Sequence, residues 1–210
     1  MPSFETLVAF TFAALLMNLS PGPSNFYVMA RSISQGTKGG LAAVAGLFVG
    51  SLIHVAAAVL GLSTLLAYSP MAYTILKLCG AAYLIYLGIN YFRRSEEKLI
   101  VEKNVGVKNY SKVFRESILV EVTNPKTGMF YLALLPQFIV PEAGPVAAQF
   151  LLLGLIVSIS AIPCDLFVTY FSSRVANSIE QNPRMQVIQN RIAGSILTAL
   201  GSYILISENR

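Results

Sequence analysis

The sequence contains few charged residues for its length. Of its 210 residues, 55% are hydrophobic and only 12% are charged, whereas a soluble domain carries roughly 25% charged residues. Three windows, residues 6–30, 39–76 and 143–164, contain no Asp, Glu, Lys or Arg at all. The first two windows are longer than the roughly 20 apolar residues that span a bilayer. The composition therefore disfavours a water-soluble globule and predicts an integral protein of a lipid bilayer.

The sequence also has few residues that could form disulfides or bind metals, and it has no nucleotide-binding motif. The two cysteines, Cys79 and Cys164, both lie in apolar segments, and the chain has one histidine. This excludes a disulfide framework and leaves no spacing for a zinc or iron–sulfur site. No Gly-x-x-x-x-Gly-Lys-Ser/Thr phosphate loop occurs. We expect no metal, no cofactor and no use of ATP. The net charge of +5 does not indicate nucleic acid, because basic residues beside membrane spans have a commoner explanation.

Long apolar segments, separated by Gly, Pro or charged residues, divide the chain. They are continuous runs, whereas the strands of a membrane barrel alternate between apolar and polar residues. The fold class is therefore predicted to be all-α, with six transmembrane helices. The expected spans are about 4–30, 41–67, 71–92, 116–139, 146–172 and 191–207.

The positive charges predict the orientation of these spans. Twelve of the fifteen Lys and Arg residues lie in the first, third and fifth gaps between the spans. The positive-inside rule places these gaps in the cytoplasm and both termini outside. The N-terminus has no basic leader and carries Glu5, so we interpret it as the first span and not as a cleaved signal.

An inverted repeat follows from this topology. We expect one membrane domain over 1–210, with one half at about 1–92, a cytoplasmic loop at 93–115 and a second half at about 116–210. Because each half crosses the membrane three times, the halves insert in opposite directions, as in many secondary transporters. The sequence echo is weak but ordered: residues 18–23 correspond to 123–128, and 80–88 to 193–201.

Three polar or helix-breaking residues are predicted to lie at the same depth. Pro21, Pro125 and Asp165 are each nine or ten residues from the nearest cytoplasmic arginine, or roughly 15 Å at 1.5 Å per residue. This is the centre of a bilayer core about 30 Å thick. A proline there removes a backbone donor and frees a carbonyl. We therefore expect helices 1 and 4 to be broken at proline near the middle of the membrane.

Such breaks favour binding of a zwitterion. The N-terminus of a helix presents unpaired N–H groups and a partial positive charge, which suit a carboxylate. The residues after Pro23 can supply these amides, Lys126 adds a full positive charge, and Asp165 can bind an ammonium group. The predicted substrate-binding residues are Asn18, Ser20, Pro21, Gly22, Pro23, Ser24, Asn25, Asn124, Pro125 and Lys126, and the predicted proton-coupling residues are Asp165 and His54.

Simpler interpretations of the same residues remain open. Proline kinks occur in membrane helices that have no binding site. Asp165 and Lys126 can form a structural pair, and the long stem of Lys126 can reach the interface if its helix tilts. His54 can serve packing by bonding to a backbone carbonyl, or it can belong to a proton path.

Other notable residues are interpreted structurally. Glu121 lies six residues from Arg115 and is expected to reach the membrane interface. Arg31 and Arg115 are interpreted as topology anchors. Gly46 and Gly50 form a Gly-x-x-x-Gly spacing that predicts close helix packing.

Several motifs resemble those of a known family. The chain is similar, from about residue 4 to 207, to the LysE superfamily of bacterial amino-acid exporters, and within it to the homoserine/threonine (RhtB) branch. The resemblance is carried by LSPGP at 19–23, Gly36, Gly39, Gly40, 45–46, Gly50, 53–54, 61–62, 80–84, 87–88, TNPK at 123–126, LPQF at 135–138, Asp165 and Tyr170. It implies a six-span protein of the cytoplasmic membrane that exports an amino acid or a close relative, driven by the proton gradient.

Two departures from the branch are visible. Pro23 and Glu121 stand where other residues are usual, and both are candidates for tuning substrate choice. Superfamily members that carry thiol electrons would need paired cysteines on the first and fourth spans, but here the cysteines lie on the third and fifth. This argues against electron transfer.

The expected function is export of an amino acid or close derivative by proton antiport with alternating access, in which the two halves rock around a cavity at mid-membrane. The alternative is a non-transporting regulatory or assembly subunit of the membrane, which would show no substrate flux. A metal-ion exporter would need a cluster of soft ligands, which the sequence lacks. The substrate and the coupling stoichiometry are left open, as is the oligomeric state, for which a homo-oligomer is one possibility.

Overall fold

The described part of the chain is helical throughout. The computed structural model describes residues 2–20, 22–69 and 109–179, with single positions between 71 and 89 and between 191 and 202. Within these ranges it contains no strand. The expected spans 71–92 and 191–207, with the repeat echo that they contain, lie largely outside the described residues.

The first half of the chain begins with two helices that meet end to end. Helix α1 covers Phe4–Leu19 and is capped by the Ser3 hydroxyl, which accepts a hydrogen bond from the Thr6 amide at 3.2 Å. Helix α2 covers Pro23–Ala57 and is followed by a π-helical turn, η1 (Ala58–Leu62), and by α3 (Ser63–Tyr68). Proline suits the first position of α2 because no helical partner exists there for an N–H group.

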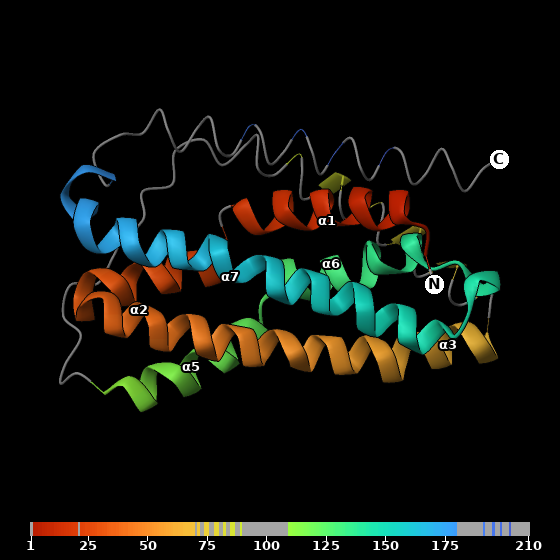
Figure 1. Cartoon of the computed structure of the whole chain (residues 1–210), viewed down its shortest axis with the longest axis horizontal. Coiled ribbons are helices and arrows are strands. Elements are labelled where there is room, and N and C mark those ends of the chain that lie inside the picture. Colours follow the sequence, from red (N-terminus) through yellow and green to blue (C-terminus); the bar gives the residue numbers. More distant parts are fainter. Residues whose placement is uncertain are drawn as a thin grey trace.

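Helix α2 turns sharply at Gly36. This residue has φ +74° and ψ −172°, which breaks α2 into two helical segments. Glycine adopts such a conformation without strain because it has no Cβ. The sequence predicted a gap from about 31 to 40 between two spans. Helix instead continues on both sides of this one residue, and the chain turns back along the molecule (Figure 1).

The second described region contains two further helices that meet end to end, then a long one. Helix α5 covers Tyr110–Val122 and α6 covers Pro125–Ala133. Two short 3-10 turns follow, η2 (Leu135–Phe138) and η3 (Pro141–Ala143), before α7 (Val146–Ile179). The predicted loop 93–115 ends earlier than expected, because Asn109 caps α5 and the helix already starts at Tyr110.

The elements form a bundle along the long axis of the molecule. Helices α1, α2 and α7 run roughly parallel to that axis, and α5 and α6 lie against them (Figure 1). Helix α2 packs mainly on α5 and α7, and α1 packs on α7. Two described helical stretches are long and apolar enough to span a membrane, Pro23–Leu65 and Val146–Ser172, whereas the sequence predicted six spans. Helix α1 is apolar but shorter.

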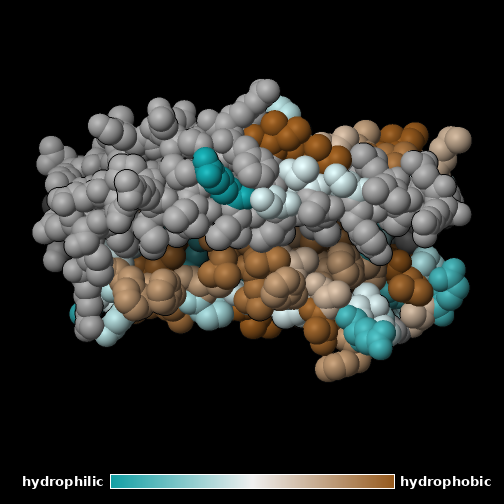
Figure 2. All heavy atoms as spheres, turned by 90° about the horizontal axis from the view of Figure 1, so that it is seen from above, coloured by the Kyte–Doolittle hydropathy of each residue, from teal (hydrophilic) through white to brown (hydrophobic). Residues whose placement is uncertain are grey.

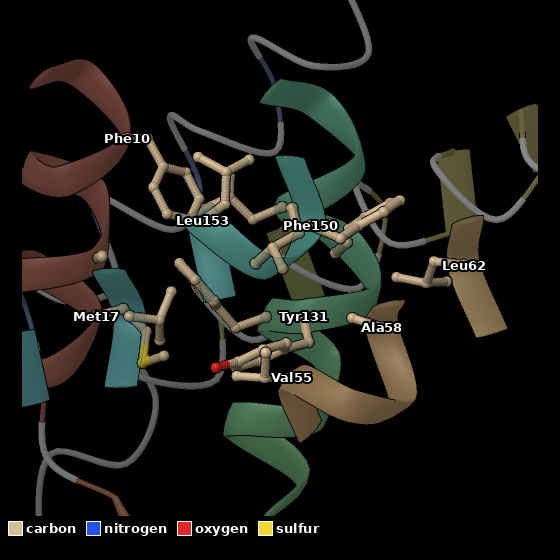
Figure 3. Close-up of a cluster of buried hydrophobic side chains, with 14 residues drawn as sticks. Phe10, Met17, Val55, Ala58, Leu62, Tyr131, Phe150 and Leu153 are labelled. Atoms are coloured by element: carbon tan, nitrogen blue, oxygen red, sulfur yellow. The ribbon is translucent and has the colours of Figure 1, made fainter. Parts of the chain in front are cut away.

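The larger apolar cluster joins both halves of the chain. Phe10 of α1 stacks edge-on against Phe138 with ring centroids 5.0 Å apart, and Phe150 and Leu153 of α7 are fully buried beside it. Tyr131 of α6 lies in the same cluster, with its hydroxyl at the edge (Figure 3). Because lipid tails are as apolar as these side chains, the cluster stabilises the bundle in a membrane through packing contacts.

The outer surface of the described helices is apolar. Large side chains such as Phe4, Phe12 and Leu60 are 81%, 64% and 72% exposed. Hydrophobic residues cover much of the described surface in Figure 2. Such a surface is an aggregation liability in water but is the normal exterior of a helix bundle that faces lipid tails.

Small residues allow α2 to lie directly against its neighbours. A Cβ atom on Gly46 would collide with the carbonyl oxygen of Phe114 on α5, and one on Gly50 would lie 2.7 Å from Cβ of Glu121. The predicted role of this Gly-x-x-x-Gly pair in close packing is therefore confirmed. Its consequence is that the last turns of α5 are held against the middle of α2.

Candidate functional site

Two helix junctions meet inside the bundle. Helix α1 ends at Leu19 and α2 begins at Pro23, while α5 ends at Val122 and α6 begins at Pro125. At the second junction Asn124 caps α6, since its Oδ1 accepts a hydrogen bond from the Lys126 amide at 3.0 Å. Each junction exposes backbone groups that have no partner within their own helix. Pro21, at which the sequence predicted a break, lies outside the described residues.

A cavity of about 40 Å³ lies where these junctions approach α7. It is lined by residues of both apolar clusters and by a polar set that comes from α1, α2, α5, α6 and α7. At roughly 10–15 Å³ per water molecule, the cavity has room for a few waters. Its polar lining consists of Asn18, Ser24, Asn25, Ser51, Glu121, Asn124, Lys126, Thr127, Ser158 and Asp165.

Lys126 supplies the positive charge of this cavity. Its Nζ donates a hydrogen bond to the backbone carbonyl of Ser20, the residue that caps the C-terminus of α1. The C-terminal end of a helix carries a partial negative charge, so it attracts an ammonium group. Gly22 leaves space for the lysine stem, since a Cβ there would lie 2.9 Å from Cδ of Lys126. Ser20 therefore contributes its carbonyl and Gly22 its lack of a side chain.

Asp165 supplies a negative charge from α7. The residue is 8% exposed, and its Oδ1 accepts a long hydrogen bond from Nδ2 of Asn25 at 3.5 Å. Asn25 also donates to the backbone carbonyl of Asn18 at 3.4 Å. Asp165 and Lys126 both line the cavity, and no ion pair joins these two residues. The cavity lining thus contains an acidic and a basic side chain that come from different helices.

Glu121 is a second carboxylate, and its position differs from the one predicted. It was expected to reach the membrane interface, but it is 7% exposed and lines the cavity. Its Oε2 accepts hydrogen bonds from the hydroxyl of Ser24 and, at 3.5 Å, from Nδ2 of Asn124. No local sequence signal gave this position, because it depends on contacts of Glu121 with Ser24 and Gly50, which are distant in sequence.

Amide and hydroxyl groups connect the walls of the cavity. Nδ2 of Asn18 donates to the Val157 carbonyl at 3.2 Å and to the Ser160 hydroxyl at 3.0 Å, which ties α1 to α7. Nδ2 of Asn124 donates to Oγ of Ser24 at 2.8 Å, which ties the two junctions to each other. A buried polar group without a partner is costly, so these bonds hold the walls in one arrangement.

The chain matches one known protein family over most of its length. The family model described as "LysE type translocator" matches residues 15–208. This chain belongs to the LysE family. It is therefore a membrane protein of a transporter family and not an enzyme, and the resemblance found on the motifs is confirmed.

Relatives of this LysE-family protein match it over nearly their whole length. A homoserine/homoserine lactone efflux protein of Salmonella typhimurium is 34% identical over 96% of this chain and 97% of its own. An uncharacterized membrane protein of Vibrio cholerae is 30% identical over 96% of this chain and 97% of its own length. The membrane protein YrhP of Bacillus subtilis, also uncharacterized, is 31% identical over 94% of this chain and 97% of its own length. No solved structure matches the chain.

His54 lies beside the cavity of this LysE-family protein and is not part of its lining. Its Nε2 lies 2.9 Å from the backbone carbonyl of Glu121, and its ring stacks on Tyr131 with centroids 5.5 Å apart. A bond to a backbone carbonyl is the arrangement expected of a packing role. The hydroxyl of Tyr131 lies 3.3 Å from that of Ser158, which is part of the lining.

The donor groups of the described residues do not suit a metal ion. Within the described ranges no three His, Cys, Asp or Glu side chains are grouped so that they could hold one. Cys79 is exposed and Cys164 half-buried, and both are free thiols. The chemistry of the cavity is therefore that of one ammonium group, two carboxylates and several amides.

Proposed function

We propose that this protein exports an amino acid, or a close derivative of one, across the cytoplasmic membrane of a bacterium in exchange for protons. The observation that carries the proposal is the buried cavity, in which groups of both charges meet at two helix junctions. Such junctions form substrate sites in secondary transporters. The name of the Salmonella relative, an efflux protein for homoserine and its lactone, points to small amino compounds of that kind.

The substrate is proposed to bind between the opposite charges. Asp165 would bind the α-ammonium group, and Lys126 would bind the carboxylate together with the free amides of Ser24 and Asn25 in the first turn of α2. Charge-assisted hydrogen bonds of this type are roughly twice as strong as neutral ones. The other predicted residues of the two junctions that the structure describes, Asn18, Ser20, Gly22, Pro23, Asn124 and Pro125, would shape the cavity and fix the positions of these groups.

Exchange of substrate for protons would follow if the substrate ammonium group and a proton compete for the carboxylate of Asp165. If Asp165 can hold either the substrate ammonium or a proton, release of substrate outside leaves a carboxylate that takes up a proton there. The protonated carboxylate then returns to the inside, where it loses its proton before it binds the next substrate. We retain His54 as a candidate for the path along which protons reach the cavity, through Tyr131 and Ser158.

Alternating access is proposed to arise from two halves inserted in opposite directions, with both termini outside. The α1–α2 and α5–α6 junctions would occupy corresponding places in these halves, since each follows the first helix that the structure describes in its half. Arg31 of α2 pairs with Glu116 of α5 at 2.8 Å, and Tyr27 donates to the same carboxylate at 3.0 Å. Arg31 lies about two helical turns from Asn25, so this cluster would close the cytoplasmic side in the present conformation and separate when the site opens inward.

Counterflow tests whether the purified protein transports an amino acid. Proteoliposomes loaded with unlabelled homoserine are diluted into buffer with a trace of labelled homoserine. A transporter produces a transient accumulation of label inside, because labelled substrate enters while mostly unlabelled substrate leaves. We expect this overshoot with the protein and not with empty liposomes. A panel of amino acids and lactones is assayed in the same way; absence of any overshoot would support a non-transporting subunit instead.

A further inference from the structure

The carboxylate of Glu121 is hydrogen-bonded to a side chain in the first turn of α2. Ser24, in the first turn of that helix, donates its hydroxyl proton to Oε2 of Glu121, and Asn124 donates to both Ser24 and Glu121. The first turn of a helix carries unpaired N–H groups and a partial positive charge. A carboxylate of the protein therefore lies beside the helix turn whose free amides would attract a carboxylate of the substrate.

Glu121 also changes the charge balance of the cavity. Lys126 shares the lining of the cavity with two acids, Glu121 and Asp165. With both acids ionised, the formal charge of the three groups is negative. Glu121 therefore screens the groups that attract the substrate carboxylate, whereas Asp165 remains available for an ammonium group.

The hydrogen bonds of Glu121 do not by themselves require a charged side chain. A glutamine at this position could keep a hydrogen bond to Ser24 and would not bury a charge, which is costly unless the charge is compensated. The acid has a direct effect on any ligand because it lines the cavity itself. By contrast, Glu116 on the same helix is paired with Arg31 and is not among the lining residues.

We propose that Glu121 determines which carboxyl derivatives the site accepts. It disfavours compounds with a free carboxylate relative to lactones, esters or amides of the same amino compound, which keep the ammonium group but have no negative charge. This inference rests on the proposed transport function and names the class of substrate for the same cavity.

The test compares one pair of substrates in proteoliposomes. Initial transport rates of homoserine and homoserine lactone are measured for the wild type and for Glu121→Gln at about pH 6.5, below the usual α-amino pKa of about 7.7–8. The relative efficiency, kcat/KM for homoserine divided by that for the lactone, is expected to rise at least about tenfold in Glu121→Gln, equivalent to about 1.4 kcal/mol. The reason is that removal of the negative charge leaves Lys126 and the α2 amides free to attract the carboxylate.

Three further variants separate this effect from a general disturbance. Glu142→Gln removes an exposed acid outside the cavity and should leave the ratio unchanged. Glu121→Met also removes the negative charge and keeps the length of the side chain, so it should shift the ratio in the same direction and decides the matter if Glu121→Gln does not fold. In a Lys126→Met background, Glu121→Gln should shift the ratio by less than about threefold, because interacting residues have non-additive effects.

The outcomes distinguish the inference from the proposed function. If the wild type transports neither compound nor any other amino compound, the proposed function fails. If the wild type transports them and Glu121→Gln changes the ratio by less than about twofold, or favours the lactone, only the role of Glu121 is overturned.

Discussion

Proton-driven export is expected to be lost when Asp165 is replaced by asparagine. Asparagine keeps the size of the side chain and an oxygen that can accept from Asn25, but it neither carries a negative charge nor takes up a proton. Removing one partner of a buried, hydrogen-bonded charge pair costs about 2–5 kcal/mol. At about 1.4 kcal/mol per factor of ten, kcat/KM should fall by roughly 30-fold or more.

The measurement uses proteoliposomes loaded with labelled homoserine and placed in an acidic buffer. The wild type should release label faster when the outside is acidic, and Asp165→Asn should not respond to the pH difference. Glu142→Gln is the matched control, because Glu142 is an exposed acid in η3 and is not part of the cavity lining. Full pH-driven release by Asp165→Asn would show that this acid neither couples protons nor binds the ammonium group.

A valine at position 46 is expected to prevent normal folding. The space at Gly46 is filled by backbone and side-chain atoms of α5: a Cβ atom there would lie 3.1 Å from the carbonyl carbon of Phe114 and 2.6 Å from Cβ of Ser117. Backbone atoms of a packed helix cannot rotate away, so α2 and α5 would have to separate. Overpacking of a tight core costs typically 1–3 kcal/mol and occasionally more; here we expect the upper part of that range.

Gly61 provides the control for this substitution. Apart from its own helix backbone and chain neighbours, no atom of the described residues lies within 4 Å of the place where its Cβ would be, so Gly61→Ala should be neutral or slightly stabilising. Size-exclusion chromatography in detergent and thermal unfolding compare the two variants. Gly46→Val should yield little monodisperse protein and a clearly lower Tm, whereas an unchanged Tm would mean that α2 and α5 are not in such close contact.

Much of the site could be predicted because membrane depth can be counted along a helix. Asp165 and Pro125 lie at similar distances from cytoplasmic arginines, and the structure brings Asp165, Asn25 and Lys126 to one cavity. Only a few polar residues lie within the long apolar segments, and such residues tend to face the interior of a bundle. The polar residues next to Pro23 and Pro125 were predicted to belong to the site for the same reason.

The position of Glu121 could not be predicted by the same counting. Depth along α5 gives the distance of Glu121 from the interface, but not the direction in which its side chain points. That direction depends on Ser24, which is distant in sequence, and on Gly50, which lets α2 approach the turn that contains Glu121. These are tertiary contacts, and no local pattern encodes them.

The turn at Gly36 was missed for a different reason. Several polar residues and glycines between 31 and 40 suggested a loop, whereas helix continues on both sides of one residue with positive φ. A single glycine is sufficient to reverse the chain here, so the composition of the surrounding residues overstated the length of the gap.

The central claim is that the substrate binds in the cavity between the two helix junctions, and protection of a thiol introduced into that cavity tests it most directly. The native cysteines are replaced by serine, and Ala161, which lines the cavity one turn before Asp165, is changed to cysteine. A Glu142→Cys variant is the control outside the cavity. We predict that saturating amounts of a compound that shows counterflow slow the reaction of a methanethiosulfonate reagent with Ala161→Cys at least about fivefold, with no effect on Glu142→Cys. Equal rates at Ala161→Cys with and without that compound would contradict the account.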